Sequence, residues 1–317
     1  MSTFLVTGAT GRQGGSTVRE LLAAGANVRA LVRDETKPEV QKLAALGASL
    51  FVAKDYNDEA TIARAVVDVE GIFLNPMPDF INPDAERAWV QRFIDAARSV
   101  SPGKLRTLVI STVSTVSHHA EWLAEDPSYP MHNYSGSKLA AEEAVRASGV
   151  PNITILRPPW LMSNYLLPML YFHFPSVAAG GEIIEMRTPM GLDNPIAHLD
   201  PRDIGRLASA ALLHPERFAG KTLAPGWKNV TIVEVAREIE AVTGRKIRVV
   251  HQDVEELKRS DDPVKKFLGS VAEWRNVRGH DLTDGELNEV RALGFEPRSL
   301  RTFLEDHKEL LWTTVPN

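Results

Sequence analysis

A glycine-rich loop near the start of the chain constrains the fold more than any other feature. It has the pattern G-x-x-G-x-x-G at residues 8–14, between a short apolar run at residues 4–7 and a segment of helical periodicity at residues 17–24. Glycines in a strand–helix turn let a ligand approach the backbone closely, and the start of the helix presents unpaired N–H groups to phosphates. The loop therefore predicts a dinucleotide-binding unit. The expected cofactor contacts are Gly8, Thr10, Gly11, Arg12, Gln13 and Gly14.

Strand-like and helical patterns alternate through the first half of the chain. The strand-like runs are residues 4–7, 28–32, 49–53, 71–74, 105–110 and 152–156, and the main helical segments are 17–24, 59–66, 83–99 and 134–147. Such alternation predicts an α/β fold with a doubly wound parallel sheet, which binds ligands at the carboxyl ends of its strands. We predict an NAD(P)-binding domain over residues 1–157.

The alternation of strand-like and helical patterns becomes weaker after Trp160, and Met and aromatic residues become frequent up to Phe174. We predict that residues 158–317 form mainly a smaller C-terminal substrate-binding lobe, with segments interleaved with the first domain. The aromatic residues, together with Trp122, could form the wall of an apolar pocket. Most of them could equally pack a small core, since sequence alone does not separate these two roles.

The end of the second predicted strand bears on the choice of cofactor. Many dinucleotide folds have an acidic residue there that binds the ribose hydroxyls, but this chain has Arg33. A guanidinium pairs well with a 2′-phosphate, and Arg12 could reach the same group, so NADP(H) is favoured over NAD(H). Asp34 weakens this argument, and a solvated arginine is the alternative. Asp55 follows the third predicted strand, and Asn75 and Pro76 follow the fourth, where contacts to adenine and to the nicotinamide ribose are expected. All three could equally be ordinary turn residues.

Tyr134 and Lys138 are the candidate catalytic residues. Their spacing of four places the phenol and the ammonium on one face of a helix. A lysine cation close to a tyrosine favours the phenolate, so the tyrosine can exchange a proton with a carbonyl or an alcohol during hydride transfer. Thr112, or otherwise Ser114, at the end of the preceding strand could hold the substrate oxygen. The alternative is that Tyr134 packs at a helix start and Lys138 is a solvated charge.

Composition excludes several other classes of function. The chain of 317 residues has no cysteine, which rules out disulfides, thiolate nucleophiles and iron–sulfur clusters. Its net charge is −5 and no predicted helix concentrates basic residues, so we expect no direct nucleic-acid binding. The adjacent His118 and His119 lack the spacing of metal ligands, and we expect no metal site. With no targeting signal and no long apolar run, the chain is expected to be cytoplasmic and not to enter a membrane.

Several motifs together resemble the NmrA-like branch of the atypical or extended short-chain dehydrogenase/reductase superfamily. These are the loop at residues 8–14, the run Ala30-Leu-Val-Arg-Asp34, Tyr134 to Lys138 and the segments 155–160, 231–246 and 295–307. The resemblance implies a Rossmann domain with a small C-terminal lobe. It also implies NADP(H) contacts at Gly8, Gly11, Arg12, Gly14, Arg33 and Lys138.

The resemblance implies two kinds of activity. Some members of this branch are reductases of quinones, enones or other carbonyl compounds, and others are regulators that bind a dinucleotide without turning it over. Because Tyr134 and Lys138 are both present, we favour an NADPH-dependent reductase of a small aromatic or unsaturated compound, acting as a monomer or homodimer. A dinucleotide-sensing regulator, or a dehydratase or epimerase that transfers a hydride transiently, is the alternative.

Overall fold

The computed structural model describes residues 1–79, 82–279 and 282–314. The chain divides into two compact units, each assembled from separate segments. The first unit contains Met1–Ala120, Asn133–Pro158 and Pro201–Ala224, and the second contains Glu121–His132, Pro159–Asp200 and Pro225–Asn317.

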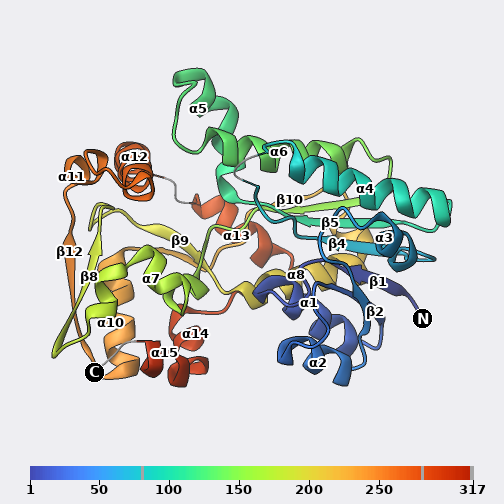
Figure 1. The fold of residues 1–317 in the computed structure, drawn as a ribbon, viewed down its shortest axis with the longest axis horizontal. Coiled ribbons are helices and arrows are strands. Elements are labelled where there is room, and N and C mark those ends of the chain that lie inside the picture. Colours follow the sequence, from blue (N-terminus) through green and yellow to red (C-terminus); the bar gives the residue numbers. More distant parts are fainter. Residues whose placement is uncertain (80–81, 280–281, 315–317) are drawn as a thin grey trace. The chain divides into compact units, whose positions relative to one another are not determined.

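A seven-stranded sheet forms the centre of the first unit (Figure 1). Its strands are β1 (Thr3–Val6), β2 (Asn27–Val32), β3 (Ser49–Val52), β4 (Gly71–Leu74), β5 (Thr107–Ser111), β6 (Asn152–Leu156) and β10 (Thr222–Leu223). Their order is β10-β6-β5-β4-β1-β2-β3, and every neighbouring pair is parallel. The predicted doubly wound parallel sheet is therefore confirmed. Strand β10 was not predicted, because two residues are too few to show a period.

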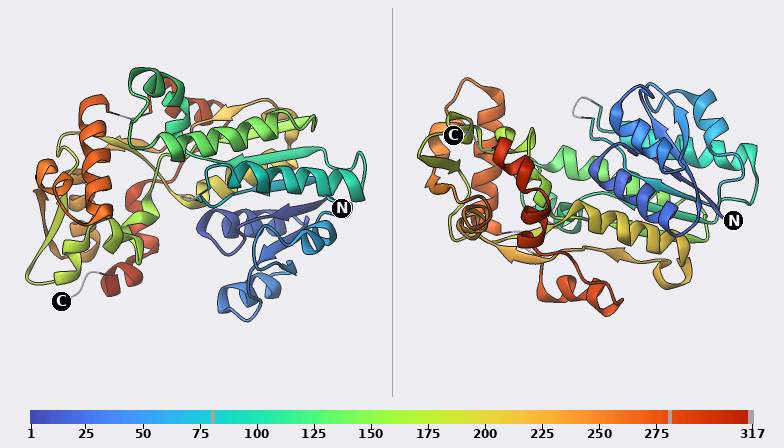
Figure 2. Two further views of the ribbon diagram at one scale, coloured as in Figure 1. Left: turned by 45° about the horizontal axis from the view of Figure 1, so that its top comes forward. Right: turned by 90° about the horizontal axis from the view of Figure 1, so that it is seen from below.

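Helices cover both faces of this sheet. They are α1 (Arg12–Ala23), α2 (Pro38–Ala45), α3 (Glu59–Ala65), α4 (Ala85–Val100), α6 (His132–Arg146), α8 (Pro201–Leu213) and α9 (Pro215–Phe218), with the 3₁₀ turn η1 (Ser114–His118). Figure 1 and Figure 2 show α4 and α6 on one face and α1 and α8 on the other. Alternate strand residues such as Leu5, Ile72 and Ile110 pack against Phe93 of α4 and Val145 of α6, as the two-residue period of a strand requires.

The order of the strands reverses between β1 and β4, and this point positions the site. The Thr7 hydroxyl, directly after β1, donates to the Phe73 carbonyl at 3.1 Å and accepts from the Asn75 N–H at 2.8 Å. In open α/β sheets, ligands bind in the crevice outside the carboxyl ends of the strands at such a reversal. The loops that follow β1, β2, β4 and β5 therefore meet at the edge where a ligand is expected.

The second unit contains two small sheets and most of the remaining helices. Its elements are α5 (His119–Glu125, from Glu121 onward), β7 (Trp160–Leu161), η2 (Met162–Tyr165), α7 (Met169–His173), η3 (Pro175–Ala179), β8 (Ile183–Thr188), β9 (Ile196–Leu199), β11 (Lys228–Val230), α10 (Ile232–Thr243), β12 (Lys246–His251), α11 (Val254–Lys258), α12 (Pro263–Arg278), α13 (Asp284–Ala292), α14 (Leu300–Asp306) and α15 (Lys308–Thr314). The sheets have the orders β11-β9-β7 and β12-β8. Among the residues that the structure describes, no helix combines the length and the apolar character of a membrane span.

Aromatic residues of the second unit belong largely to its core. Met162, Tyr165 and Phe174 are buried with residues of α10 and α14, and Trp160 packs against this core while partly exposed. Packing is thus the role of most residues in this segment. Trp122 lies in another aromatic cluster, with ring centroids 5.7 Å from Tyr129 and 6.3 Å from Trp274.

Candidate active site

The glycine loop joins β1 to α1 in a conformation that leaves backbone N–H groups available. Gly8 has a positive φ of 59°, which favours glycine, and its carbonyl accepts from the Gly11 N–H at 2.8 Å. Helix α1 begins at Arg12 with no side-chain cap and no acidic residue in its first turn. The first N–H groups of a helix need a partner from outside it. An anion at this position would supply that partner and would interact favourably with the helix dipole.

The loop also has the close packing that a bound pyrophosphate requires. A Cβ at Gly14 would lie 2.3 Å from the Gly8 carbonyl oxygen and 2.8 Å from that of Thr7. Helix α1 therefore lies against the loop at a distance that only glycine permits. Gln13 Oε1 is buried with no hydrogen-bond partner among the described residues, and Thr10 and Arg12 are exposed. These features fit a dinucleotide phosphate, with its ligands coming from the loop and the start of α1.

Arg33 is exposed directly after β2, at the edge of the sheet that carries the glycine loop. Asp34 is bound within its own loop, where it accepts from the Thr36 N–H at 2.9 Å and from the Thr36 hydroxyl at 2.6 Å. These two hydrogen bonds lower the pKa of Asp34, with a smaller contribution from Lys37. The Asp34 carboxylate is thus held by Thr36 within its own loop, and it keeps its negative charge beside Arg33.

Tyr56 lies near the glycine loop and was not predicted from the sequence. Its ring makes edge-to-face contacts with Trp89 and Phe93, at centroid distances of 5.5 and 5.6 Å. Burial raises the pKa of Tyr56, and hydrogen bonds at Thr7 and Gly8 and the charge of Arg33 oppose this effect. Tyr56 therefore adjoins the glycine loop from the segment that follows β3.

Asp55 is exposed, and its carboxylate accepts from the Asn57 N–H at 2.6 Å, as in a turn.

Tyr134 and Lys138 lie one turn apart in α6, as their spacing predicts. The Lys138 Nζ atom is 5.8 Å from the centroid of the Tyr134 ring, which is half-buried. The same Nζ donates to the Pro76 carbonyl, just after β4, at 2.9 Å. Lys138 and Pro76, both expected to contact the cofactor, are therefore in contact with each other. Asn75, the residue before Pro76, donates its N–H to the Thr7 hydroxyl.

Lys138 has a partner that the sequence did not reveal. Its Nζ atom lies 2.6 Å from Oε2 of Glu86 in the first turn of α4, and the Ser137 hydroxyl donates to Oε1 at 3.0 Å. The side chains of Lys138 and Glu86 are 5% and 0% exposed. Burial lowers the pKa of Lys138 and raises that of Glu86, and in each case the charge of the other partner opposes the effect.

The two hydroxyls after β5 have different surroundings. Thr112 is 7% exposed and donates to Oε1 of Glu142 at 2.7 Å. Glu142 is fully buried, and its Oε2 atom lies 2.6 Å from Arg157 Nη2. Ser114 begins the η1 turn half-buried, with its N–H bound to the Pro158 carbonyl. The Thr112 hydroxyl is thus engaged in a buried network, and Ser114 is the better placed of the two for a substrate oxygen.

Glu86 and Glu142 share a signal that can be read from sequence. Glu86 lies four residues before Val90 and seven before Phe93, so it is on the same face of α4 as these two core residues. Glu142 lies three residues before Val145, which faces the core from α6. An acidic residue on the apolar face of an amphipathic helix is buried, and a buried carboxylate requires a partner. Lys138 and Arg157 are those partners.

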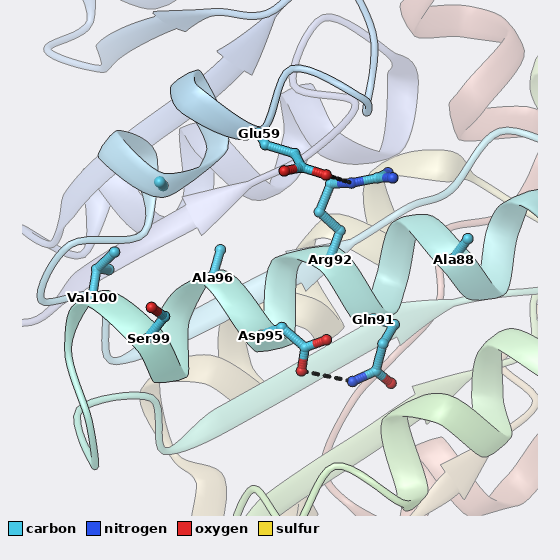
Figure 3. Close-up of a pocket in the computed structure, with 9 residues that line it drawn as sticks. Glu59, Ala88, Gln91, Arg92, Asp95, Ala96, Ser99 and Val100 are labelled. Atoms are coloured by element: carbon cyan, nitrogen blue, oxygen red, sulfur yellow. Dashed lines mark hydrogen bonds and ion pairs between the residues drawn. The ribbon is translucent and has the colours of Figure 1, made fainter.

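A groove of about 580 Å³ lies on the surface of α3 and α4 (Figure 3). The ion pair between Glu59 and Arg92 crosses it, and small side chains such as Ala88 and Ala96 line it. Its described lining includes neither the glycine loop nor Tyr134 and Lys138. The groove is therefore not the candidate active site.

Comparisons with known proteins agree with this architecture. A model of the NmrA-like family matches residues 1–304. The chain is 31% identical over 246 residues to the (4-alkanoyl-5-oxo-2,5-dihydrofuran-3-yl)methyl phosphate reductase of Streptomyces griseus, covering 77% of this chain and 75% of that protein.

Two solved structures share the fold. The triphenylmethane reductase of Citrobacter sp. complexed with NADP(H) has a TM-score of 0.71 and 19% identity, covering 95% of this chain and 98% of that one. NmrA, a negative transcriptional regulator solved in complex with NADP, has a TM-score of 0.69 and 21% identity, covering 100% and 92%.

Proposed function

Because the chain belongs to the NmrA-like family, we propose that it is an NADPH-dependent oxidoreductase that reduces a small carbonyl, enone or quinone-type compound. The observation that carries this proposal is the placement of Tyr134 beside Lys138, with Lys138 bound to the strand end next to the glycine loop. The Streptomyces griseus relative is a reductase, and its named substrate is an unsaturated lactone, which favours a conjugated substrate here as well.

The residues of the loop and of the neighbouring strand ends hold the cofactor. Gly8, Gly11 and Gly14 admit the pyrophosphate to the start of α1, and Arg33 binds the 2′-phosphate that distinguishes NADPH from NADH. Asn75 and Pro76 lie on the nicotinamide side of the loop. When bound, a reduced nicotinamide supplies a hydride to the substrate.

The protein supplies the proton and the orientation. Tyr134 donates its phenolic proton to the substrate oxygen as negative charge develops there. Lys138 fixes the segment after β4 through its hydrogen bond to the Pro76 carbonyl. Ser114 donates a hydrogen bond to the same oxygen, while Thr112 fixes the strand end through Glu142. Removal of a general acid of this kind typically reduces the rate by about 10²- to 10⁴-fold.

The test follows NADPH absorbance against a panel of quinones, enones, ketones and aldehydes, with wild type and Tyr134→Phe. We expect turnover by the wild type, and in the variant a loss of kcat of at least about 100-fold with NADPH affinity unchanged. Full activity of the variant would refute the role of Tyr134. Tight NADPH binding by the wild type with no turnover across the panel would instead support a dinucleotide-sensing regulator.

A further inference from the structure

The carboxylate of Glu86 is buried beside Lys138, one of the residues of the proposed site. Helix α4 brings it there on the face that also contributes Val90 and Phe93 to the core, and none of its side chain is exposed. One oxygen lies 2.6 Å from Lys138 Nζ and the other accepts from the Ser137 hydroxyl. A buried carboxylate is costly unless it has a charged partner, so its position reflects its contact with the lysine.

The pairing determines what charge Tyr134 meets. With one proton shared between the ammonium and the carboxylate, Lys138 and Glu86 together carry no net charge, whichever of them holds that proton. The Tyr134 ring centroid is 5.8 Å from Lys138 Nζ, close enough for an unpaired ammonium to favour the phenolate strongly. A neutral pair at the same position favours it much less.

We propose that Glu86 is a positioning residue that neutralises Lys138 and thereby shifts the balance of Tyr134 from the phenolate toward the protonated phenol. This inference rests on the proposed function, because it assigns Glu86 a part in the same reaction. In that reaction the substrate carbon gains a hydride from the reduced nicotinamide, and the substrate oxygen gains the phenolic proton as the Tyr134 O–H bond breaks. Water then returns a proton to the tyrosinate. Donation of a proton to the substrate oxygen in reduction requires the phenol, whereas oxidation of an alcohol requires the phenolate.

Other charged groups near the pair are present in both wild type and variant. Asp79 acts electrostatically on Glu86, and the His119 ring lies beside Gly136 in α6, where an added Cβ would be 3.5 Å from it. Glu142 and Arg157 form a separate pair one turn further along α6. A change in the titration of Tyr134 that follows substitution of Glu86 is therefore attributable to the charge at that position.

The test is an ultraviolet titration of tyrosinate in wild type and Glu86→Gln, which removes the charge and keeps the size. The chain has five tyrosines, and subtracting the titration of the matching Tyr134→Phe variant isolates the signal of Tyr134. We expect Glu86→Gln to move the midpoint of Tyr134 to lower pH by about one pH unit or more. Coincident midpoints in wild type and Glu86→Gln would overturn the proposal.

A double variant keeps the test decisive if Glu86→Gln fails to fold. Removing both members of a buried ion pair is tolerated better than removing one of them. The double variant Glu86→Gln with Lys138→Met therefore has a better chance of folding, and it replaces a neutral pair with two neutral side chains. We expect its Tyr134 midpoint to match that of the wild type, and a displaced midpoint would overturn the proposal. Asp203→Asn is the control for losing a buried, ion-paired carboxylate from a first helical turn, here in α8, and should leave the midpoint unchanged.

The titration needs no substrate, so it is independent of the reductase assignment. If no compound in the panel is reduced, the proposed function fails while the charge effect is still measured. If one is reduced, the alkaline limb of the kcat profile should move to lower pH in Glu86→Gln by the same amount as the tyrosinate midpoint. An alkaline limb that stays in place would overturn the proposal.

Discussion

Gly14→Ala tests whether the close packing of α1 against the glycine loop serves cofactor binding. The added Cβ would lie 2.3 Å from the Gly8 carbonyl oxygen and 2.7 Å from the Gly8 carbonyl carbon, whereas ordinary contacts begin at 3.4 Å. The obstructing atoms are backbone, so no side chain can rotate away. The start of α1 and the loop must therefore separate by about 1 Å.

Two effects of opposite sign determine the stability of this variant. Overpacking of this kind costs about 2 kcal/mol. The better helix propensity of alanine returns at most about 1 kcal/mol. We therefore expect the free energy of unfolding to fall by about 1 kcal/mol or more. The displaced N–H groups of α1 should also weaken NADPH binding by about tenfold or more, which corresponds to about 1.4 kcal/mol.

Chemical denaturation and fluorescence titration with NADPH measure the two effects separately. Gly285→Ala is the matched control, because Gly285 is in the first turn of α13 and its nearest neighbour, Thr283 Oγ1, is 3.7 Å from the position of the added Cβ. The control should be neutral or slightly stabilising and should bind NADPH as the wild type does. If Gly14→Ala matched this control in both measurements, the packing argument would be refuted.

Two other changes test the cofactor and the core. Arg33→Ala should weaken NADPH binding by about tenfold and leave NADH binding unchanged, because only NADPH carries the 2′-phosphate; equal losses for both in calorimetric titrations would contradict this role. Burial lowers the pKa of His198 to about 4, so below the ordinary value of 6.5 the unfolded chain binds a proton that the folded chain excludes. The free energy of unfolding should therefore fall by about 3 kcal/mol as the pH falls from 7 to 4. Denaturation curves should show a smaller fall in His198→Gln, and an equal fall would assign the loss to other groups.

The parts of the fold that could be predicted from sequence depend on local pattern. Strands β1, β2, β4, β5 and β6 are short, largely buried runs, whereas β3 is a partly exposed edge strand. The alternation with helices implies that all six are parallel. The β10 edge strand was missed because a pairing of two residues leaves no pattern. Helix α2 was missed as well, although Pro38 at its start is typical of a first helical turn. The choice between packing and ligand binding for the aromatic residues near Tyr165 required tertiary structure, because both roles demand the same residue types.

Some contacts of the candidate site could likewise be predicted from local pattern, and others could not. Tyr134 and Lys138 were predictable because residues four apart meet on a helix, and the glycine loop because its conformation depends on adjacent residues. The partner of Lys138 was not predictable from spacing, because Glu86 belongs to a different helix 52 positions earlier and an acidic residue there resembles a solvated charge. Its place on an apolar face distinguishes it, since desolvation makes an unpaired carboxylate there costly. The same reasoning applies to Glu142, which binds Thr112 and Arg157. Charged residues on apolar helix faces thus indicate which side chains hold a site in place, and their partners are then sought among the candidate catalytic residues.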